Sequence, residues 1–296
     1  MKDKVALFYN PVAGGGNFRF KLDDVIHYLQ SSGLQVIPYR TNNNQDIKKQ
    51  MENLNPQDYH TIVAAGGDGT IHGVVNAMMY HDISVPLGVF PVGTSNDLAR
   101  QMKIANKIKD YCRVITDGKL TCIDLGNVNG EYFINVAAAG YLTDTAHEVN
   151  YNLKNKLGKA AYYLKVVEKL PQMRPLQLRL RVDDHTYEME ILLFICLNGN
   201  TAAGFKEILP TGSISDGKLD FMAFKPLPPL GGLERLLLNY SRGQLIKDEN
   251  VFYCQGTKFS LELTPAVTTD LDGEKGPKLP WEITVYPSAL QLRIPG

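Results

Sequence analysis

Residues 66–70 carry the run GGDGT, which constrains the fold of this chain more than any other stretch. The run follows an apolar segment, residues 61–65, that predicts a buried strand, and precedes apolar residues at helical spacing from Ile71 to Met79. Glycines between a strand and a helix start let backbone N–H groups face phosphate oxygens. The run therefore predicts an α/β nucleotide site, in which Asp68 would serve a hydrated Mg²⁺.

Strand and helix patterns alternate throughout the first part of the chain. Such an order predicts a parallel sheet flanked by helices, whose ligands bind beyond the carboxyl ends of the strands. The loops expected at that edge are residues 10–16, 66–70 and 93–97. The expected strands are residues 5–9, 34–39, 62–65 and 85–92, and the expected helices are residues 18–29 and the segment after Thr70.

Beyond residue 124 the pattern changes to hairpins and apolar–polar alternation, which predicts an antiparallel β-sandwich. Asn129–Gly130 is a strong hairpin turn, and residues 183–185 form another turn. We therefore expect a nucleotide-binding domain at 1–124 and a sandwich at 125–286, with the tail (about 287–296) packing back on the first domain. The expected strands are 176–182, 187–197, 218–224, 258–263, 281–285 and 290–294, and one helix is expected at 156–170.

Composition excludes several classes of protein. Lys+Arg and Asp+Glu are both 31, so no global positive field favours a nucleic-acid partner. The four cysteines form no Cys-x-x-Cys pair, which argues against zinc and predicts buried free thiols in a reducing compartment. No apolar run approaches the roughly 18 residues of a membrane span, and the N-terminal apolar run is too short for a signal peptide. A cytoplasmic protein is the resulting expectation.

Three common nucleotide-site templates are absent from the sequence. There is no Gly-x₄-Gly-Lys-Ser/Thr run, so the chain is not a P-loop protein. The GDGTIH stretch at residues 67–72 lacks the third glycine of the dinucleotide-binding fingerprint. Neither His-Arg-Asp nor Asp-Phe-Gly occurs, which excludes an ordinary protein kinase.

Six segments in a fixed order resemble the diacylglycerol kinase catalytic-domain superfamily, and within it the bacterial soluble lipid kinases. One such loop alone would be weak evidence, since a single loop is compatible with many functions. Six of them in the same order make a chance resemblance implausible. The segments are residues 10–16 (NPVAGGG), 66–70 (GGDGT), 91–100 (PVGTSNDLAR), 124–126 (DLG), 215–220 (SDGKLD) and 272–274 (DGE).

The resemblance implies a fold, an activity and a set of nucleotide contacts. The implied fold is an NAD-kinase-like α/β domain followed by a β-sandwich, with catalysis in the cleft between them. The implied activity is ATP-dependent phosphorylation of diacylglycerol to phosphatidic acid. The implied contacts to phosphate and nucleotide are Asn10, Thr41, Gly66, Gly67, Gly69, Thr70 and Thr94.

The resemblance also assigns the acidic residues. Asp68, Asp97 and Asp124 would form an acidic cluster that orders Mg²⁺ and its waters. Glu274 would be the general base that takes the proton of the lipid hydroxyl, and Asp68 is the second candidate because a base shared with Mg²⁺ loses basicity.

A second, structural metal is implied at the 215–220 loop. Asp216, the Lys218 backbone and Asp220 would hold it, although Asp-Gly also favours a plain polar turn between strands.

Several alternatives stay open at this point. The acceptor could be another lipid alcohol, namely phosphatidylglycerol, ceramide, a sphingoid base or undecaprenol, or a soluble hydroxyl, since NAD kinases share the GGDGT loop. A catalytically silent lipid-binding regulator on the same fold is the alternative from another class. The resemblance implies peripheral association with the inner face of the membrane, and a homodimer is plausible. Lysines 154, 156 and 159 fit a membrane-facing patch or a solvated helix face equally well.

Overall fold

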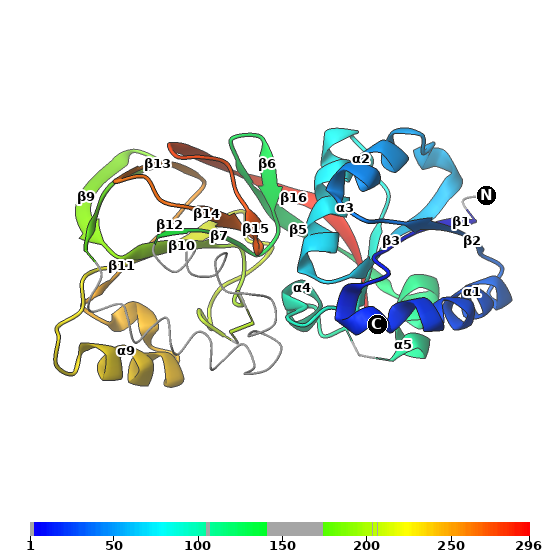
Figure 1. Ribbon diagram of the computed structural model, residues 1–296, viewed down its shortest axis with the longest axis horizontal. Helices are drawn as coiled ribbons and strands as arrows, with labels where there is room; N and C mark the ends of the chain where they lie inside the picture. Colours follow the sequence, from blue (N-terminus) through cyan, green and yellow to red (C-terminus); the bar gives the residue numbers. More distant parts are fainter. Residues whose placement is uncertain (1–2, 105–106, 141–173, 203, 206) are drawn as a thin grey trace. The chain divides into compact units, whose positions relative to one another are not determined.

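A computed structural model describes residues 3–104, 107–140, 174–202, 204–205 and 207–296 of the chain (Figure 1). The helix expected at 156–170 and the lysines at 154, 156 and 159 lie outside these residues. The chain folds into two compact units, which are called unit 1 and unit 2 below. Unit 1 comprises Met1–Leu125 and Pro287–Gly296, and unit 2 comprises Gly126–Tyr286.

Unit 1 is built on a parallel sheet of four strands in the order β2-β1-β3-β4. The centre of β1 and nearly all of β3 are buried, as expected for strands covered by helices on both faces. Their apolar runs explain why the sequence predicted them well. The strands are β1 (Lys4–Tyr9), β2 (Gln35–Arg40), β3 (Tyr59–Gly66) and β4 (Leu87–Pro91).

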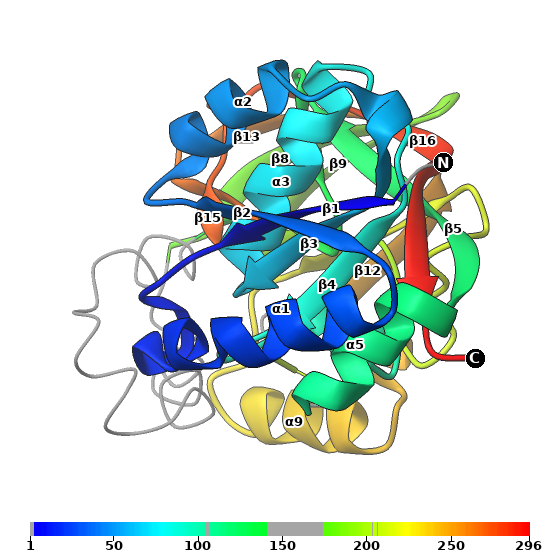
Figure 2. The ribbon, with the colours of Figure 1, turned by 90° about the vertical axis from the view of Figure 1, so that its right-hand side faces the viewer.

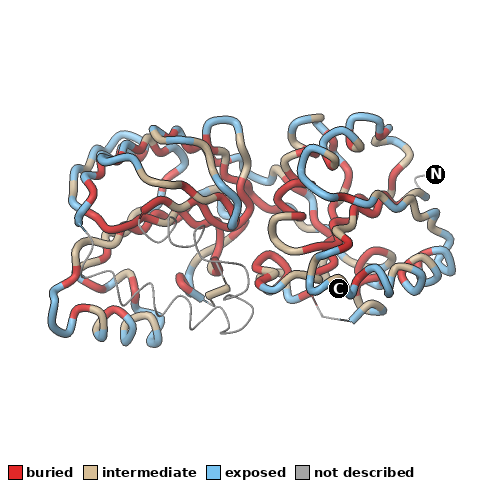
Figure 3. Tube along the Cα trace, viewed as in Figure 1, coloured by how far each residue is buried: buried red, intermediate tan, exposed pale blue. Residues whose placement is uncertain are grey.

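Helices cover both faces of this sheet, α1 and α5 on one face and α2 and α3 on the other (Figure 2). Figure 3 shows the buried strands between the exposed outer sides of these helices. α2 and α5 were not predicted. α2 buries only Ile47 and Met51, and its start is marked by the Asn43 side chain, which accepts a hydrogen bond from the Asp46 amide. The helices are α1 (Leu22–Ser31), α2 (Asn44–Glu52), α3 (Asp68–Tyr80), α4 (Asp97–Gln101) and α5 (Ile108–Asp117).

Two long strands connect the units: β5 (Lys119–Val128) leaves unit 1, and β16 (Trp281–Ile294) returns to it. At its end β16 pairs in parallel with β4, with Leu292 opposite Leu87. The Arg293 guanidinium donates to the Thr61 hydroxyl at 2.6 Å, and both side chains are buried. Pro287–Gly296 is thus bound to unit 1 by ladder and side-chain hydrogen bonds.

Unit 2 is an antiparallel β-sandwich, and together with the parallel sheet of unit 1 it confirms the predicted fold class. One sheet has the order β12-β11-β10-β7-β14-β15, and the other contains β13, β8, β9 and the start of β16, with β6 paired to β5. The strands are β6 (Glu131–Phe133), β7 (Val136–Gly140), β8 (Leu176–Val182), β9 (His185–Ile191), β10 (Leu193–Leu197), β11 (Leu219–Phe224), β12 (Val251–Gly256), β13 (Lys258–Thr264), β14 (Thr269–Leu271) and β15 (Glu274–Lys275).

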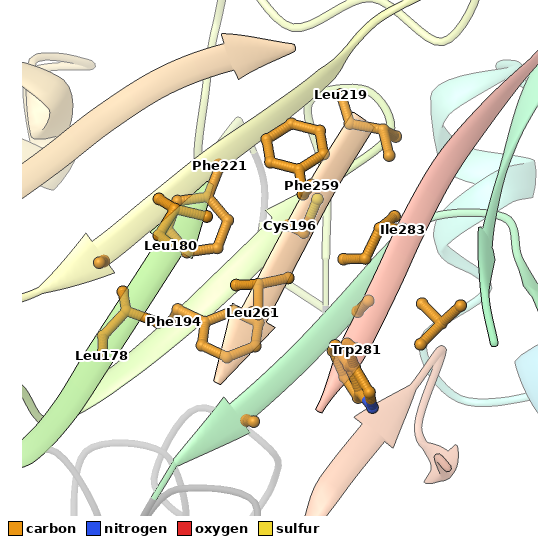
Figure 4. Packing of buried hydrophobic residues seen from close by; sticks show 14 of the residues in the cluster. Leu178, Leu180, Phe194, Cys196, Leu219, Phe221, Phe259, Leu261, Trp281 and Ile283 are labelled. Atoms are coloured by element: carbon orange, nitrogen blue, oxygen red, sulfur yellow. The ribbon is translucent and has the colours of Figure 1, made fainter. Parts of the chain in front are cut away.

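The core of unit 2 lies between its two sheets and is rich in aromatic side chains (Figure 4). Trp281 packs edge-on against Phe194, and its indole N–H donates to the Pro277 carbonyl oxygen at 2.8 Å. Side chains alternate along β10: Phe194 enters this core, whereas Leu193 enters a second cluster with Leu236 of α9 (Gly232–Ser241). Both faces of the six-stranded sheet are therefore apolar.

Three sequence predictions about structure were wrong. The strand expected at 187–197 is two strands, β9 and β10, which belong to different sheets, because the chain changes sheet at Leu192. The strands expected at 281–285 and 290–294 are one strand, β16. All four cysteines are free, but only Cys112 and Cys196 are buried: Cys254 is half-buried, and Cys122 is exposed near the start of β5, where most residues are exposed.

Candidate functional site

The three glycine-containing loops follow β1, β3 and β4 and meet at the carboxyl edge of the parallel sheet. Their backbones approach so closely that side chains are excluded. A Cβ on Gly93 would lie 2.3 Å from the Gly67 Cα, and one on Gly14 would lie 1.9 Å from the Val92 carbonyl oxygen. The edge therefore presents backbone rather than side chains, next to the N-terminus of the thirteen-residue helix α3. This is a surface on which phosphate oxygens could approach N–H groups.

We expect Gly93→Ala to destabilise the protein by about 1–3 kcal/mol, as overpacking does in general. The added methyl group would overlap the Gly67 backbone, so one of the two loops must move. Chemical unfolding followed by circular dichroism measures the loss. Gly67→Ala is the matched control, because its Cβ would lie 3.4 Å from the Gly93 Cα, an ordinary contact. Equal stability of the two variants would contradict the packing argument.

Asp68 joins two of these loops through its carboxylate. Its Oδ1 accepts the Asp97 backbone N–H at 2.8 Å, and its Oδ2 accepts the Asn96 backbone N–H at 3.1 Å. Both amides belong to the start of α4, so Asp68 caps that helix from a distant loop. Asp68 is also the first residue of α3, where a carboxylate is stabilised by the helix dipole. The residue expected to serve Mg²⁺ thus has a structural task as well.

Asn96 shapes the loop that carries Asp97. Its backbone is left-handed, with φ 52°, a conformation that Asn tolerates better than most residues. Its side-chain Oδ1 accepts the Gly93 N–H at 2.9 Å, and its Nδ2 donates to the Gly93 carbonyl oxygen at 3.0 Å. The Asn96 side chain thus connects the two ends of the turn at residues 93–96.

The other expected nucleotide contacts are spread over the same edge with different exposures. Asn10 accepts the Val12 N–H at 3.0 Å and so forms its own turn. Thr41 is buried, and its hydroxyl donates to the Tyr9 carbonyl oxygen at 3.2 Å. Thr70 is buried in the first turn of α3, so it does not cap that helix, which begins at Asp68. Gly66 is buried, Gly67 and Gly69 are half-buried, and Thr94 is exposed.

Of the three expected magnesium-site residues, Asp68 and Asp97 are in contact through the Asp97 N–H, and Asp124 lies on a different element, β5. Asp97 is buried at the start of α4, and Asp124 is buried in β5, where it accepts the Ser288 N–H at 2.7 Å. Within the part of the chain that the structure describes, no three His, Cys, Asp or Glu side chains gather as metal ligands. Mg²⁺ beside phosphates is commonly held by one or two carboxylates together with waters and phosphate oxygens, so the expected ion does not require a cluster of three protein ligands.

Glu274 lies in unit 2, directly after a two-residue turn formed by Asp272 and Gly273. Its side chain is exposed and forms no hydrogen bond or ion pair with the described residues. By contrast, the carboxylate of Asp272 is buried and accepts three backbone N–H groups. The structure therefore presents Glu274 as a solvent-facing carboxylate on a firmly held turn.

Asp216, Lys218 and Asp220 are at the start of β11 in unit 2. The Lys218 N–H donates to Asp216 at 3.1 Å, which makes a polar turn. Asp220 is buried and accepts from the Tyr253 hydroxyl at 2.7 Å and the Gln255 amide at 2.8 Å. Burial raises the pKa of Asp220, although both hydrogen bonds act in the opposite direction. Four strand spacings separate β11 from β15, so this loop lies about 19 Å from Glu274 across the sheet.

Some residues of this site were not singled out from the sequence. Gly93 and Asn96 were recognised only as parts of a loop, although Gly and Asn are both typical turn residues. Two sets of hydrogen bonds had no sequence signal: those of the Asp272 carboxylate with the backbone of residues 134–136, called the Asp272 clamp below, and that between Asp124 and Ser288. In each case the two partners lie more than 130 residues apart in the chain.

Comparisons with known proteins agree with the geometry. Residues 4–128 match the family "Diacylglycerol kinase catalytic domain", and residues 135–294 match the "YegS C-terminal NAD kinase beta sandwich-like domain". The diacylglycerol kinase of Bacillus subtilis (strain 168) is 34% identical over 280 residues, with 94% of this chain and 92% of that protein covered. That of Staphylococcus haemolyticus (strain JCSC1435) is also 34% identical over 280 residues, covering 95% and 84%.

A solved diacylglycerol kinase structure from Bacillus anthracis str. Sterne has the same fold. The TM-score is 0.81 at 24% sequence identity, and 99% of this chain and 97% of that chain are covered.

Proposed function

The chain belongs to the diacylglycerol kinase catalytic-domain family, and from this membership we propose that it transfers a phosphoryl group from ATP to the hydroxyl of diacylglycerol, giving phosphatidic acid. A kinase activity accords with relatives that are 34% identical over nearly the whole chain and carry the name diacylglycerol kinase. The observation that supports the donor site best is the packing of Gly67 against Gly93 beside the start of α3. This packing keeps side chains away from the edge, as a site where a polyphosphate approaches the backbone requires.

Within this proposal the residues of unit 1 bind and orient the nucleotide. Asn10, Thr41, Gly66, Gly67, Gly69, Thr70 and Thr94 are the proposed contacts. Mg²⁺ bound with the nucleotide would neutralise charge that develops on the phosphoryl oxygens. Asp68, Asp97 and Asp124 are the residues that would hold its water shell. Asp216, Asp220 and the Lys218 backbone are the proposed holders of a second, structural ion.

Glu274 is the proposed general base. An alcohol is a weak nucleophile, and a carboxylate within hydrogen-bond reach takes its proton as the new oxygen–phosphorus bond forms. An exposed Glu274 with no partner among the described residues is ready to accept such a proton. Asp68 is less suited, because both of its oxygens already accept backbone N–H groups.

The acceptor is proposed to be a lipid met at a membrane surface. None of the helices in the described ranges is long and apolar enough to cross a bilayer. Peripheral association with the inner face of the membrane, from the cytoplasm, is the mode of access that we propose, and a homodimer remains part of the proposal.

The acceptor is tested by following transfer of ³²P from ATP to a panel of alcohols. The panel contains diacylglycerol, phosphatidylglycerol, ceramide, sphingosine and undecaprenol in mixed micelles, with NAD as the soluble acceptor. We expect label in phosphatidic acid, and a rate that rises with the surface fraction of diacylglycerol rather than with its bulk concentration. Label in another lipid would change the acceptor only, whereas label in NAD alone would refute the lipid-kinase proposal.

A further inference from the structure

The hairpin that carries Glu274 is short, and its turn is closed within the hairpin by Asp270, whose Oδ1 accepts the Gly273 N–H at 2.8 Å. β15 contains two residues, and among the described strands it lies at the edge of its sheet and pairs with β14 alone. Asp272 and Gly273 both have positive φ, 54° and 92°, as in the tight turns that favour Asp-Gly. Because the Glu274 side chain contacts no described partner, its position depends on the backbone of this turn.

The carboxylate of Asp272 fastens that backbone to residues 134–136, which lead into β7. Its Oδ2 accepts the Ile134 N–H at 2.7 Å, and its Oδ1 accepts the N–H groups of Asn135 at 2.8 Å and Val136 at 3.0 Å. The Asp272 N–H donates in return to the Val136 carbonyl oxygen at 2.9 Å. Hydrogen bonds to an ionised acceptor are shorter and stronger than neutral ones, and here they are buried.

The strand ladder alone does not account for this arrangement. β14 already pairs with β7 through three residue pairs, which end at Leu271 opposite Ala137. The clamp begins where that ladder ends, and it holds the turn rather than the strand. Asp270 closes the turn within the hairpin, whereas Asp272 ties the same turn to residues 134–136, so Asp272 determines where the turn and Glu274 sit relative to the rest of the sheet.

We propose that Asp272 is a positioning residue for Glu274, which it holds in place through the Asp272–Gly273 turn. The inference rests on the proposed function, in which Glu274 is the general base. A base displaced by about 1 Å can lose roughly 10²-fold in rate, so a turn without its clamp is expected to lower turnover rather than nucleotide binding.

The test measures kcat and the KM for ATP in Asp272→Asn. The variant keeps the size of the side chain, but it places an amide group where two acceptor oxygens are needed. We expect kcat to fall by about 10–10²-fold, with the KM for ATP unchanged. Asp183→Asn is the matched control: Asp183 also has positive φ, 48°, and accepts the N–H groups of Thr257 and Lys258, in the other sheet of unit 2. Its kcat should stay at the wild-type value.

A double-mutant cycle separates positioning from general loss of structure. In a Glu274→Gln background, Asp272→Asn should lower kcat no further, because the base that it positions is already gone. An equal loss in both backgrounds would overturn the inference. If Asp272→Asn fails to fold, Asp272→Glu, which keeps the charge, enters the same cycle. A wild-type rate in Glu274→Gln alone would instead refute the assignment of the base, and the two failures are thus distinguishable.

Discussion

Glu274→Gln is expected to lower kcat by about 10²–10⁴-fold, the usual contribution of a general base, while ATP still binds. Glutamine has nearly the same shape as glutamate but cannot take a proton from the acceptor hydroxyl. Because the Glu274 side chain is exposed and bonded to no described residue, its replacement should leave the stability of unit 2 unchanged. The loss should therefore appear in turnover and not in the unfolding midpoint.

Steady-state kinetics with diacylglycerol in mixed micelles, together with calorimetric titration of ATP, measures the two effects separately. Glu262→Gln is the control, since Glu262 is an exposed carboxylate of β13 in the other sheet of the same unit. It should leave kcat unchanged. A near-normal kcat in Glu274→Gln would transfer the role of base to Asp68, the second candidate.

Elements of the fold were predictable from the sequence where a local residue pattern reflects how the element is buried or how its backbone turns. β1 and β3 are continuous apolar runs because helices cover both of their faces. The hairpin at Asn129–Gly130 was predictable because both residues have positive φ, 51° and 95°. The switch of sheet at Leu192 was not, because β9 and β10 follow one another almost without a break and nothing local marks which sheet each strand joins.

In the candidate site, too, local features were predictable from the sequence, whereas contacts between distant residues were not. The glycine loops could be located from the sequence because each follows a strand of one parallel sheet. The hydrogen bonds of Asp68 to Asn96 and Asp97 could not, because they join loops that are 28 and 29 residues apart. A carboxylate that caps a distant helix looks, in the sequence, the same as one that is free to bind a metal.

Asp68→Ala is expected to abolish measurable kinase activity at ordinary Mg²⁺ concentrations. Two losses combine in this variant. The amides of Asn96 and Asp97 lose their acceptor, which costs about 1–3 kcal/mol for each buried donor left unsatisfied. The proposed water shell of Mg²⁺ loses a carboxylate as well, and removal of one preorganised electrostatic group commonly costs about 10²–10³-fold in kcat.

Asp68→Asn separates these two losses, because its remaining oxygen can still cap one amide while the charge is gone. If Asp68 serves the ion, residual activity of this variant should need more Mg²⁺ than the wild type does, as a titration of rate against Mg²⁺ would reveal. Asp46→Asn is the control: Asp46 accepts one backbone N–H, from Asn42, at the start of α2, and its loss should leave the Mg²⁺ dependence alone. An unchanged Mg²⁺ dependence in Asp68→Asn, with a lowered unfolding midpoint, would reduce Asp68 to its structural role. The carboxylate of GGDGT would then act by fixing the loop of Asp97, and the metal site would have to be sought at Asp97 and Asp124.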